Sequence, residues 1–380
     1  MRVDYFSQAK ELGEYWVSQN VAMRDGVVLH YAVYMAAQPS RGHALILLDH
    51  GEFIEKYCEV AEDLARRGWQ AWCLEWRGQG RYHTHTGETG EEGEASGNEA
   101  NEASQQANTL GWFDVSVSDF DEFWQRVWLP ETQEKPGLIL AHGIGAHLLL
   151  RWMFSNRRRD FGRNAMILTA PMLRPWSVQL PVFIGYLLSL VMNALNPLTP
   201  YPGQERESAR DKNFATNRLT QDETRFRIFE RWREMNPELM PRPRSSNWLA
   251  SAMHSSNRLR RDLVTGGTGW TKWFSKLSRL LTRRRKPCLA RKGLKAKYRA
   301  FCEVVAEFRK TLRLNVPTLA LLTPADEIVD GYSQYLLAGR FARGRIVDFS
   351  DARHDLLHER DDVRDRVWDE MDKFILKVFG

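Results

Sequence analysis

Short runs of aliphatic and β-branched residues recur along the chain, and most end at turn residues and are followed by helical patterns. Runs such as ALILL, LILA and AMILTA are almost continuously apolar, which is typical of parallel strands buried on both faces. We predict strands at Val28–Tyr34, Ala44–His50, Gln70–Trp76, Gly137–His142, Ala165–Ala170, Pro317–Leu322 and Arg345–Phe349.

Helical periodicity fills the stretches between these strands. The clearest examples are Glu55–Arg67, Val115–Trp128 and His147–Asn156. Strands that alternate with helices are the pattern of a doubly wound sheet. The predicted fold class is therefore α/β, with a mostly parallel, doubly wound sheet.

Two long stretches interrupt the alternation. Thr84–Asn108 is rich in Gly, Ser, Asn and Ala, with six Glu and no Lys, Arg or aromatic residue. Such a tract buries too little apolar surface to order itself, so we predict a disordered acidic insertion. Residues 172–315 lie between two predicted strands, and we interpret them as an inserted helical cap. The prediction is a core in two parts, 1–171 and 316–380, around that cap.

Composition limits the chemistry. The 380 residues are 43% hydrophobic, enough for a sizeable core, and the four cysteines (Cys58, Cys73, Cys288 and Cys302) show neither CxxC nor metal-ligand spacing. We therefore predict no disulfide framework, no metal and no cofactor. The first residues, MRVDYFSQAKELGEYW, lack the apolar region of a secretory signal, which favours a cytoplasmic protein.

The net charge of +6 conceals an asymmetry. Arg258–Arg299 holds fifteen Lys or Arg and one acid, and the rest of the chain is net acidic. Within the predicted basic segment, 257–299, apolar residues gather on one face of a helix. The other faces of that helix, and the residues that follow it, are basic. The apolar face includes Trp270, Trp273 and Phe274, and the basic residues include Arg283, Arg284 and Arg285.

A basic amphipathic helix rich in Trp, Phe and Leu is typical of an anchor on anionic lipid, here the inner membrane face. The alternative is an ordinary cap helix with a solvated basic face. Nucleic acid is not an expected partner, because no nucleic-acid-binding motif accompanies the charge. Leu180–Leu198 approaches the length of a membrane span. It is interpreted as an apolar helix of the cap, with interfacial contact and a true span as alternatives.

Leu138–Leu149, LILAHGIGAHLL, combines a strand, a tight turn flanked by glycines and a helix. This is the form of the nucleophile elbow, G-x-S-x-G, in which small residues permit a strained turn that presents a serine above the sheet. Gly143 stands where that serine belongs. A turn of this kind also suits phosphate binding at a helix N-terminus, so the flanking segments have to decide.

The flanking segments favour a hydrolase. Asp49-His50-Gly51-Glu52 follows the second predicted strand, where the backbone N–H of Glu52 would face a substrate carbonyl oxygen, and the N–H of Ile144 would supply the second oxyanion donor. Asp326 and His354 follow two later strands, in the chain order of an α/β-hydrolase triad. His354 would be the general base oriented by Asp326, with Asp330 as the reserve acid.

Several blocks together resemble bacterial lysophospholipases, within the monoacylglycerol-lipase branch of α/β-hydrolases. They are GEFIEKYCEV, LARRGWQAWCLEWRGQGRY, LAHGIGAH, TAPML, TPADEIVD and DARHDLLHERD, and the similarity covers about Val28–Gln79, Asn108–Leu173 and Leu314–Gly380. The resemblance implies serine-dependent hydrolysis of a lysophospholipid or monoglyceride, beneath a cap that shapes the acyl pocket. The departures are Gly143, Tyr82 in place of a small residue, and the long acidic and basic insertions.

Glycine at position 143 removes the nucleophile, and no Ser, Thr or Cys lies between Pro136 and Phe154 to replace it. His142 and His147 flank the turn and are assigned to packing. Three hypotheses remain: a slow hydrolase in which His354 activates water, a lipid-binding or membrane-associated pseudoenzyme, or an engineered knockout. Tyr82 and the insertions favour natural divergence.

Overall fold

The computed structural model describes residues 13–35, 41–80, 111–132, 135–155, 161–175, 211–239, 244–265 and 313–380, with isolated positions at 10–11, 187, 190–191 and 194. Eight strands form one sheet: β1 (Trp16–Ala22), β2 (Val28–Tyr34), β3 (Gly42–Leu47), β4 (Trp69–Leu74), β5 (Gly137–His142), β6 (Asn164–Thr169), β7 (Leu314–Leu322) and β8 (Phe341–Asp348).

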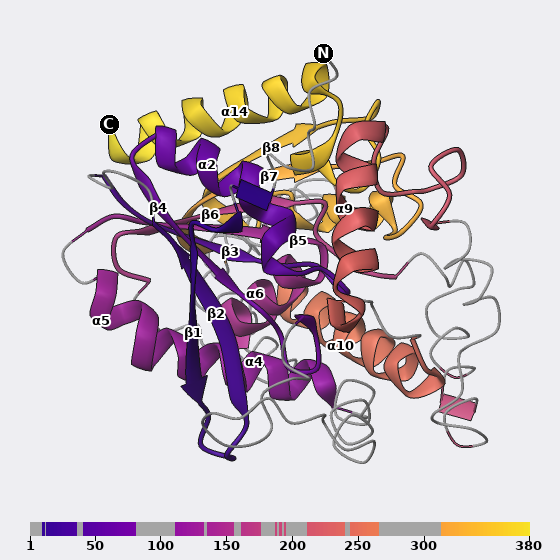
Figure 1. The fold of residues 1–380 in the computed structure, drawn as a ribbon. Helices are drawn as coiled ribbons and strands as arrows, with labels where there is room; N and C mark the ends of the chain where they lie inside the picture. Colours follow the sequence, from indigo (N-terminus) through magenta and orange to yellow (C-terminus); the bar gives the residue numbers. More distant parts are fainter. Residues whose placement is uncertain are drawn as a thin grey trace, which may run out of the picture.

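The helices of the described part are α2 (Cys58–Arg66), α4 (Trp112–Phe123), α5 (Leu129–Thr132), α6 (Gly143–Ser155), α9 (Glu223–Met235), α10 (Ser246–Thr265) and α14 (Asp361–Phe379). Helices α2 and α14 cover one face of the sheet, and α4 and α6 cover the other (Figure 1). This is the predicted doubly wound α/β architecture, and helices enclose the central strands on both faces. All residues of β3, β5 and β6 are buried, which explains their continuous apolar runs.

The strand order is β1-β2-β4-β3-β5-β6-β7-β8, with β1 and β2 antiparallel additions to a parallel sheet. The chain leaves β3 toward α2 on one face and leaves β5 toward α6 on the other (Figure 1). In open α/β sheets, ligands bind outside the carboxyl ends of two strands whose connections diverge in this way. The candidate site lies there.

The seven predicted strands are all present, and β2 and β5 have the predicted bounds. The prediction that the second strand continues to His50 was wrong, because β3 ends at Leu47. A Cβ on Gly145 would lie 2.4 Å from the Leu47 carbonyl oxygen. The chain therefore leaves the sheet where α6 packs directly against its backbone, and this turn places Asp49 beside the elbow.

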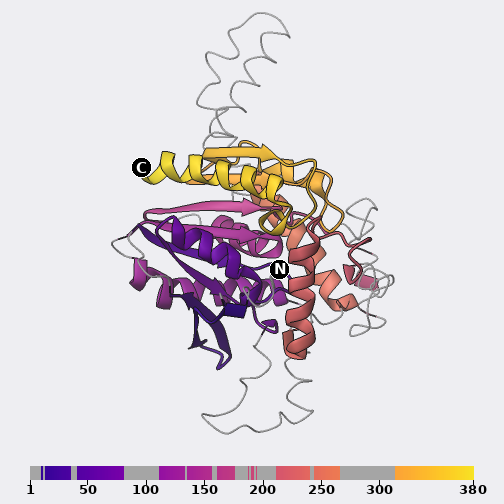
Figure 2. The same ribbon diagram turned by 45° about the horizontal axis from the view of Figure 1, so that its top comes forward.

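Two helices of the predicted cap lie within the described residues. Helices α9 and α10 stand beyond the carboxyl ends of the strands (Figure 2). In α9, Arg225 pairs with Glu59 at 2.7 Å and with Asp361 at 2.8 Å, which ties the helix to the core. No helix among the described residues is long and apolar enough to cross a membrane.

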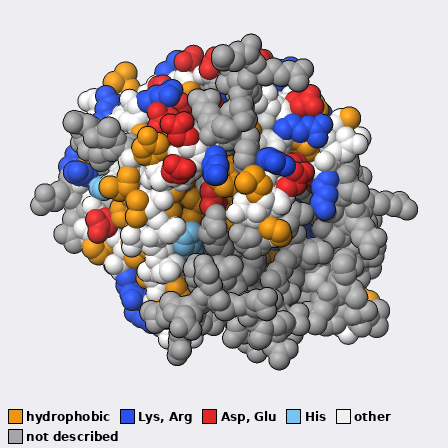
Figure 3. All heavy atoms as spheres, in the orientation of Figure 1, with side chains coloured by type: hydrophobic (Ala, Val, Ile, Leu, Met, Phe, Trp, Pro, Cys, Tyr) orange, Lys and Arg blue, Asp and Glu red, His pale blue; other side chains and the backbone are white. Residues whose placement is uncertain are grey.

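Three predictions fall on other parts of the chain. The acidic insertion 84–108, most of Leu180–Leu198 and the segment that carries Trp270, Trp273, Phe274, Arg283, Arg284 and Arg285 lie outside the described residues. On the face of the molecule in Figure 3, acidic and basic side chains are interspersed over the described surface.

Candidate active site

The strand–turn–helix predicted around Gly143 is present. Strand β5 ends at His142, α6 begins at Gly143, and Gly143 has a φ of +49°, in the left-handed region that glycine adopts without strain. Gly145 touches the end of β3 so closely that any side chain there would collide with backbone. Both glycines therefore serve the turn for separate geometric reasons.

Two predicted residues, Asp326 and His354, come together from the loops after β7 and β8. Nδ1 of His354 lies 2.6 Å from Oδ2 of Asp326, and both side chains are fully buried. The backbone N–H groups of Ile328 and Val329 donate to Oδ1 of Asp326, at 2.7 and 3.0 Å. Burial alone would raise the pKa of Asp326, but the charge and hydrogen bond of His354 outweigh it and keep that pKa low. Asp330, the reserve acid, instead caps the turn at Ser333.

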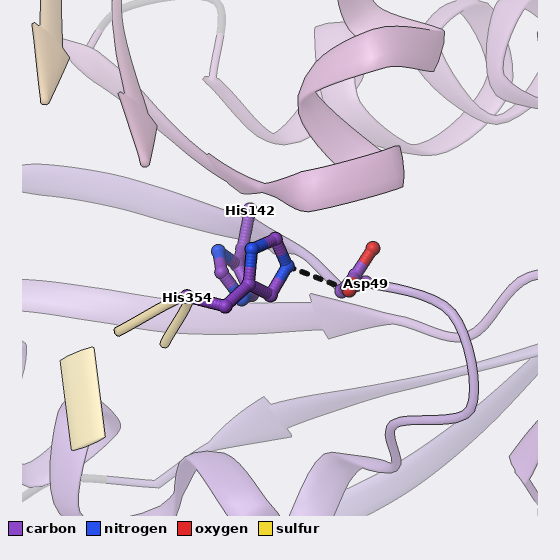
Figure 4. Close-up of side chains that lie close together, drawn as sticks. All are labelled: Asp49, His142 and His354. Atoms are coloured by element: carbon purple, nitrogen blue, oxygen red, sulfur yellow. Dashed lines mark hydrogen bonds and ion pairs between the residues drawn. The ribbon is translucent and has the colours of Figure 1, made fainter. Parts of the chain in front are cut away.

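The decisive residue is one to which the sequence analysis gave no role. Asp49 accepts a hydrogen bond from the backbone N–H of Ile144 at 2.6 Å through Oδ1, and its Oδ2 lies 3.1 Å from Nε2 of His354 (Figure 4). A Cβ built on Gly143 would lie 2.2 Å from that same Oδ1. The Asp49 carboxylate therefore occupies the space that a side chain at position 143 would need.

His354 is consequently held between two carboxylates. Because Asp49 and Asp326 can only accept, both ring nitrogens of His354 must donate, so the ring is an imidazolium. Burial alone would lower the pKa of His354, but the charges and hydrogen bonds of Asp326 and Asp49 raise it well above its ordinary value. Burial would likewise raise the pKa of Asp49, and His354 holds it well below its usual range. A charged imidazolium has no lone pair with which to act as a base.

The two histidines assigned to packing differ in their environments. His147 lies between the Met172 carbonyl oxygen at 2.8 Å and Oγ of Ser255 at 2.7 Å. Burial and the nearby Arg151 charge lower the pKa of His147 to about 3, so it stays neutral. His142 uses only Nδ1, on the oxygens of Thr169, and its buried Nε2 has no hydrogen-bond partner among the described residues.

The side chain of Glu52 belongs to a buried ionic cluster next to the site. It accepts from the backbone N–H of Asp49 at 2.8 Å and from the Tyr57 hydroxyl at 2.7 Å, and it pairs with Lys56. Lys56 also lies 2.6 Å from Asp355. Burial would lower the pKa of Lys56, but Asp355 and Glu52 keep it raised, so all three groups stay charged. The role of the Glu52 N–H as an oxyanion donor stays a prediction.

The family described as serine aminopeptidase, S33, matches residues 38–361 of the chain. The chain belongs to this family. The match covers most of the chain, and with the eight-stranded, mostly parallel sheet it confirms the predicted α/β-hydrolase assignment. No curated protein sequence matches this S33 hydrolase.

Solved structures share the fold of this S33 hydrolase at low identity. A soluble variant of monoglyceride lipase from Saccharomyces cerevisiae, in complex with a substrate analog, is 13% identical, with 96% of each chain covered and a TM-score of 0.56. A lipase in an open form is 13% identical over 96% of this chain and all of that chain, with a TM-score of 0.60. A thermostable carboxyl esterase from Bacillus coagulans, with glycerol bound, is 12% identical over 96% and 99%, with a TM-score of 0.55.

At the elbow of this S33 hydrolase, a carboxylate is fixed where serine acyl transfer needs a hydroxyl. Asp49 fills the space beside Gly143 and already accepts from the Ile144 N–H that would stabilise an oxyanion. The sequence marks Asp49 only as an acidic residue directly after a buried strand. Its importance depends on the close contact between the segment after β3 and the first turn of α6, which no sequence pattern shows.

Proposed function

We propose that this lipase-like hydrolase binds a lysophospholipid- or monoglyceride-like lipid and does not hydrolyse it by serine acyl transfer. The observation that carries the proposal is the Asp49 carboxylate, which lies against Gly143 and accepts from Ile144. An acyl carbonyl cannot use that N–H while Asp49 holds it, and position 143 offers no hydroxyl to attack. The lipid class comes from the predicted family resemblance and is supported by the monoglyceride lipase among the similar structures.

The position of Asp49 also bears on how the serine was lost. A single engineered exchange of serine for glycine would not by itself supply a carboxylate that fits the resulting space. Asp49 is bonded on both oxygens, to Ile144 and to His354, and its side chain is only 11% exposed. The pair of residues therefore favours natural divergence of the whole site over an engineered knockout.

The test uses fluorophosphonate labelling and turnover of lysophosphatidylcholine and monoolein, all with EDTA present. The native chain should do neither but should bind monoolein saturably. Gly143→Ser should label at under about a tenth of the level of Gly143→Ser/Asp49→Ala, because the serine needs the space that Asp49 fills. Asp49→Ala alone is the matched control and should stay silent.

Two results would contradict the proposal. Serine-type labelling of the native chain would show a nucleophile that the site does not contain. A double variant that keeps the native circular dichroism and melting temperature but stays unlabelled would show that the turn at Gly143 is not a lipase site.

Membrane association is a separate part of the proposal. We infer from the sequence that the basic amphipathic segment 257–299 docks on anionic lipid, where its Trp and Phe side chains would enter the interface. Its support is the sequence pattern alone, because the aromatic and Arg-rich part lies outside the described residues.

A further inference from the structure

Three side chains at the carboxyl ends of the strands combine the donor atoms that divalent transition metals prefer. Asp49 follows β3, His142 ends β5 and His354 follows β8, and one ligand atom from each lies within 4.8 Å of the other two. Figure 4 shows the two imidazole rings side by side, with the Asp49 carboxylate at the edge of His354. All three residues are buried.

His142 supplies the observation that points to a ligand. Its Nδ1 lies 3.2 Å from the carbonyl oxygen and 3.1 Å from the hydroxyl oxygen of Thr169, so that nitrogen is engaged. Donation from Nδ1 to the carbonyl leaves Nε2 with a lone pair, the form in which a histidine binds a metal. That Nε2 is buried, on a residue only 1% exposed, and it has no hydrogen-bond partner among the described residues. Buried polar atoms are nearly always satisfied, so an unpartnered ring nitrogen on a residue clustered with two other metal-ligating side chains points to a ligand.

The outer contacts of the three residues are those of a metal site. Metal-binding histidines usually donate their second ring N–H to a carboxylate or a backbone carbonyl, which fixes the ring and its tautomer. His354 has Asp326 in that place at 2.6 Å, and His142 has Thr169. The third ligand is Asp49. Its Oδ1 accepts from the N–H of Ile144, and this hydrogen bond orients the carboxylate so that Oδ2 faces His354.

The spacing of Asp49 and His354 fits a shared ion. Two ligand atoms that are each about 2.0 Å from a tetrahedral zinc ion lie about 3.3 Å apart. Oδ2 of Asp49 and Nε2 of His354 are 3.1 Å apart. A cation between them would replace the proton on Nε2, while the Nδ1 contact to Asp326 would stay unchanged.

A neighbouring set of donors, Glu52, His142 and Asp355, is less suitable. Lys56 pairs with both Glu52 and Asp355, so that pair of carboxylates already holds a cation. Among the described residues, no Lys or Arg pairs with Asp49 or Asp326, whose only cationic partner is His354. Metal binding is therefore expected at Asp49 and not at the Lys56 cluster.

We propose that Asp49, His142 and His354 bind one divalent first-row transition metal, with Zn²⁺ the expected ion. Two imidazoles and one carboxylate suit zinc and iron and disfavour Mg²⁺ and Ca²⁺, which prefer oxygen ligands. Three protein ligands leave a fourth position open, as in catalytic zinc sites, where the metal activates a bound water. The inference does not depend on the lipid assignment, because it rests on the ligand set alone.

The test is titration of the EDTA-stripped full chain with Zn²⁺, followed by calorimetry and by competition with a chromophoric chelator. We expect one ion per chain. Asp49→Asn and His142→Gln should each weaken binding by at least about 100-fold, and the outer-shell change Asp326→Asn should weaken it by about 10–100-fold. Glu52→Gln is the matched control: unchanged affinity places the ion at Asp49, and a loss equal to that of Asp49→Asn overturns the assignment.

Co²⁺ spectra keep the inference testable if a variant fails to fold. The native chain with one equivalent of Co²⁺ should show the intense visible bands of a four-coordinate ion with nitrogen ligands. No binding, or Zn²⁺ affinity unaffected by both Asp49→Asn and His142→Gln in folded protein, would overturn the proposal. Metal binding without any lipid binding would reject the proposed function and leave the metal site standing.

Discussion

At the scale of single residues, the site is organised by charges that lie within hydrogen-bonding distance of one another and away from water. Asp326, His354 and Asp49 form one such chain, and Glu52, Lys56 and Asp355 form another beside it. Removing one partner from a buried ion pair leaves the other charge uncompensated, which is more costly than losing the attraction alone.

The sequence predicted one of the two contacts in the first chain of charges. An acid and a histidine after successive strands meet at the same edge of a parallel sheet, so the contact between Asp326 and His354 follows from topology. The contact of Asp49 with Gly143 and Ile144 could not be foreseen, because it depends on close packing between the segment after β3 and the start of α6, which are far apart in the sequence. The same limit applies to Lys56, which a helical pattern places on a face but not in a buried ionic cluster.

Replacing Lys56 tests the second chain of charges. Lys56→Met leaves Glu52 and Asp355 buried without their cation, so we expect the free energy of unfolding at pH 7 to fall by about 3–5 kcal/mol. Urea denaturation followed by circular dichroism measures it. Lys373→Met, the same exchange at a solvent-exposed pair, should change it by less than about 1 kcal/mol. Equal effects of the two exchanges would show that the buried cluster does not stabilise the fold.

At the scale of elements, strands buried on both faces were predicted closely, and the edge of the sheet was not. Strand β1 was missed because most of its WVSQNVA side chains are exposed, so its sequence carries no apolar run. Helix α6 begins four residues earlier than predicted, at Gly143, because glycine at the elbow has low helix propensity although the turn requires it. Elements that are packed on a single side have weaker hydrophobic patterns in their sequences.

Helix α10 is joined to α6 by a contact that acid should weaken. His147 of α6 bonds to Ser255 of α10, and burial lowers the pKa of His147 to about 3. Above pH 6.5 the histidine is neutral in both the folded and the unfolded chain. As the pH falls from about 6.5 toward 3, His147 becomes protonated in the unfolded chain but stays neutral in the folded chain. The free energy of unfolding therefore declines by up to about 1.4 kcal/mol per pH unit.

The measurement is urea denaturation at several pH values between 7 and 4. The glutamine in His147→Gln can still bond to Ser255 but does not titrate. In this variant the decline in the free energy of unfolding should be shallower by up to about 1.4 kcal/mol per pH unit. Identical slopes for the native chain and the variant would show that His147 is not held neutral by the fold.

At the scale of the whole molecule, the α/β class and the order of the core elements followed from alternating apolar and helical patterns. The face of the sheet on which each helix packs did not follow from these patterns. Periodicity identifies an element but does not say which neighbour covers it. The division into core and cap stays a prediction. Within the described residues, α9 and α10 contact the core through Arg225 and Ser255.

Docking of the basic segment on membranes predicts a strong dependence on salt. The native chain should co-sediment with vesicles that contain phosphatidylserine and not with pure phosphatidylcholine, and binding should fall steeply as NaCl rises to 0.5 M. Exchange of residues 283–285 to Glu should abolish it. The matched control exchanges Arg24, Arg231 and Lys377 to Glu, which should leave most of the binding. Co-sedimentation that ignores both salt and lipid charge would reject the docking.

The contact between positions 49 and 143 makes the two residues epistatic. In the observed rotamer, the Asp49 carboxylate fits only while position 143 lacks a Cβ. A serine introduced at position 143 would meet an occupied space, so its effect on reactivity should depend on which residue stands at position 49. We therefore expect a change at both positions to exceed the sum of the two single changes.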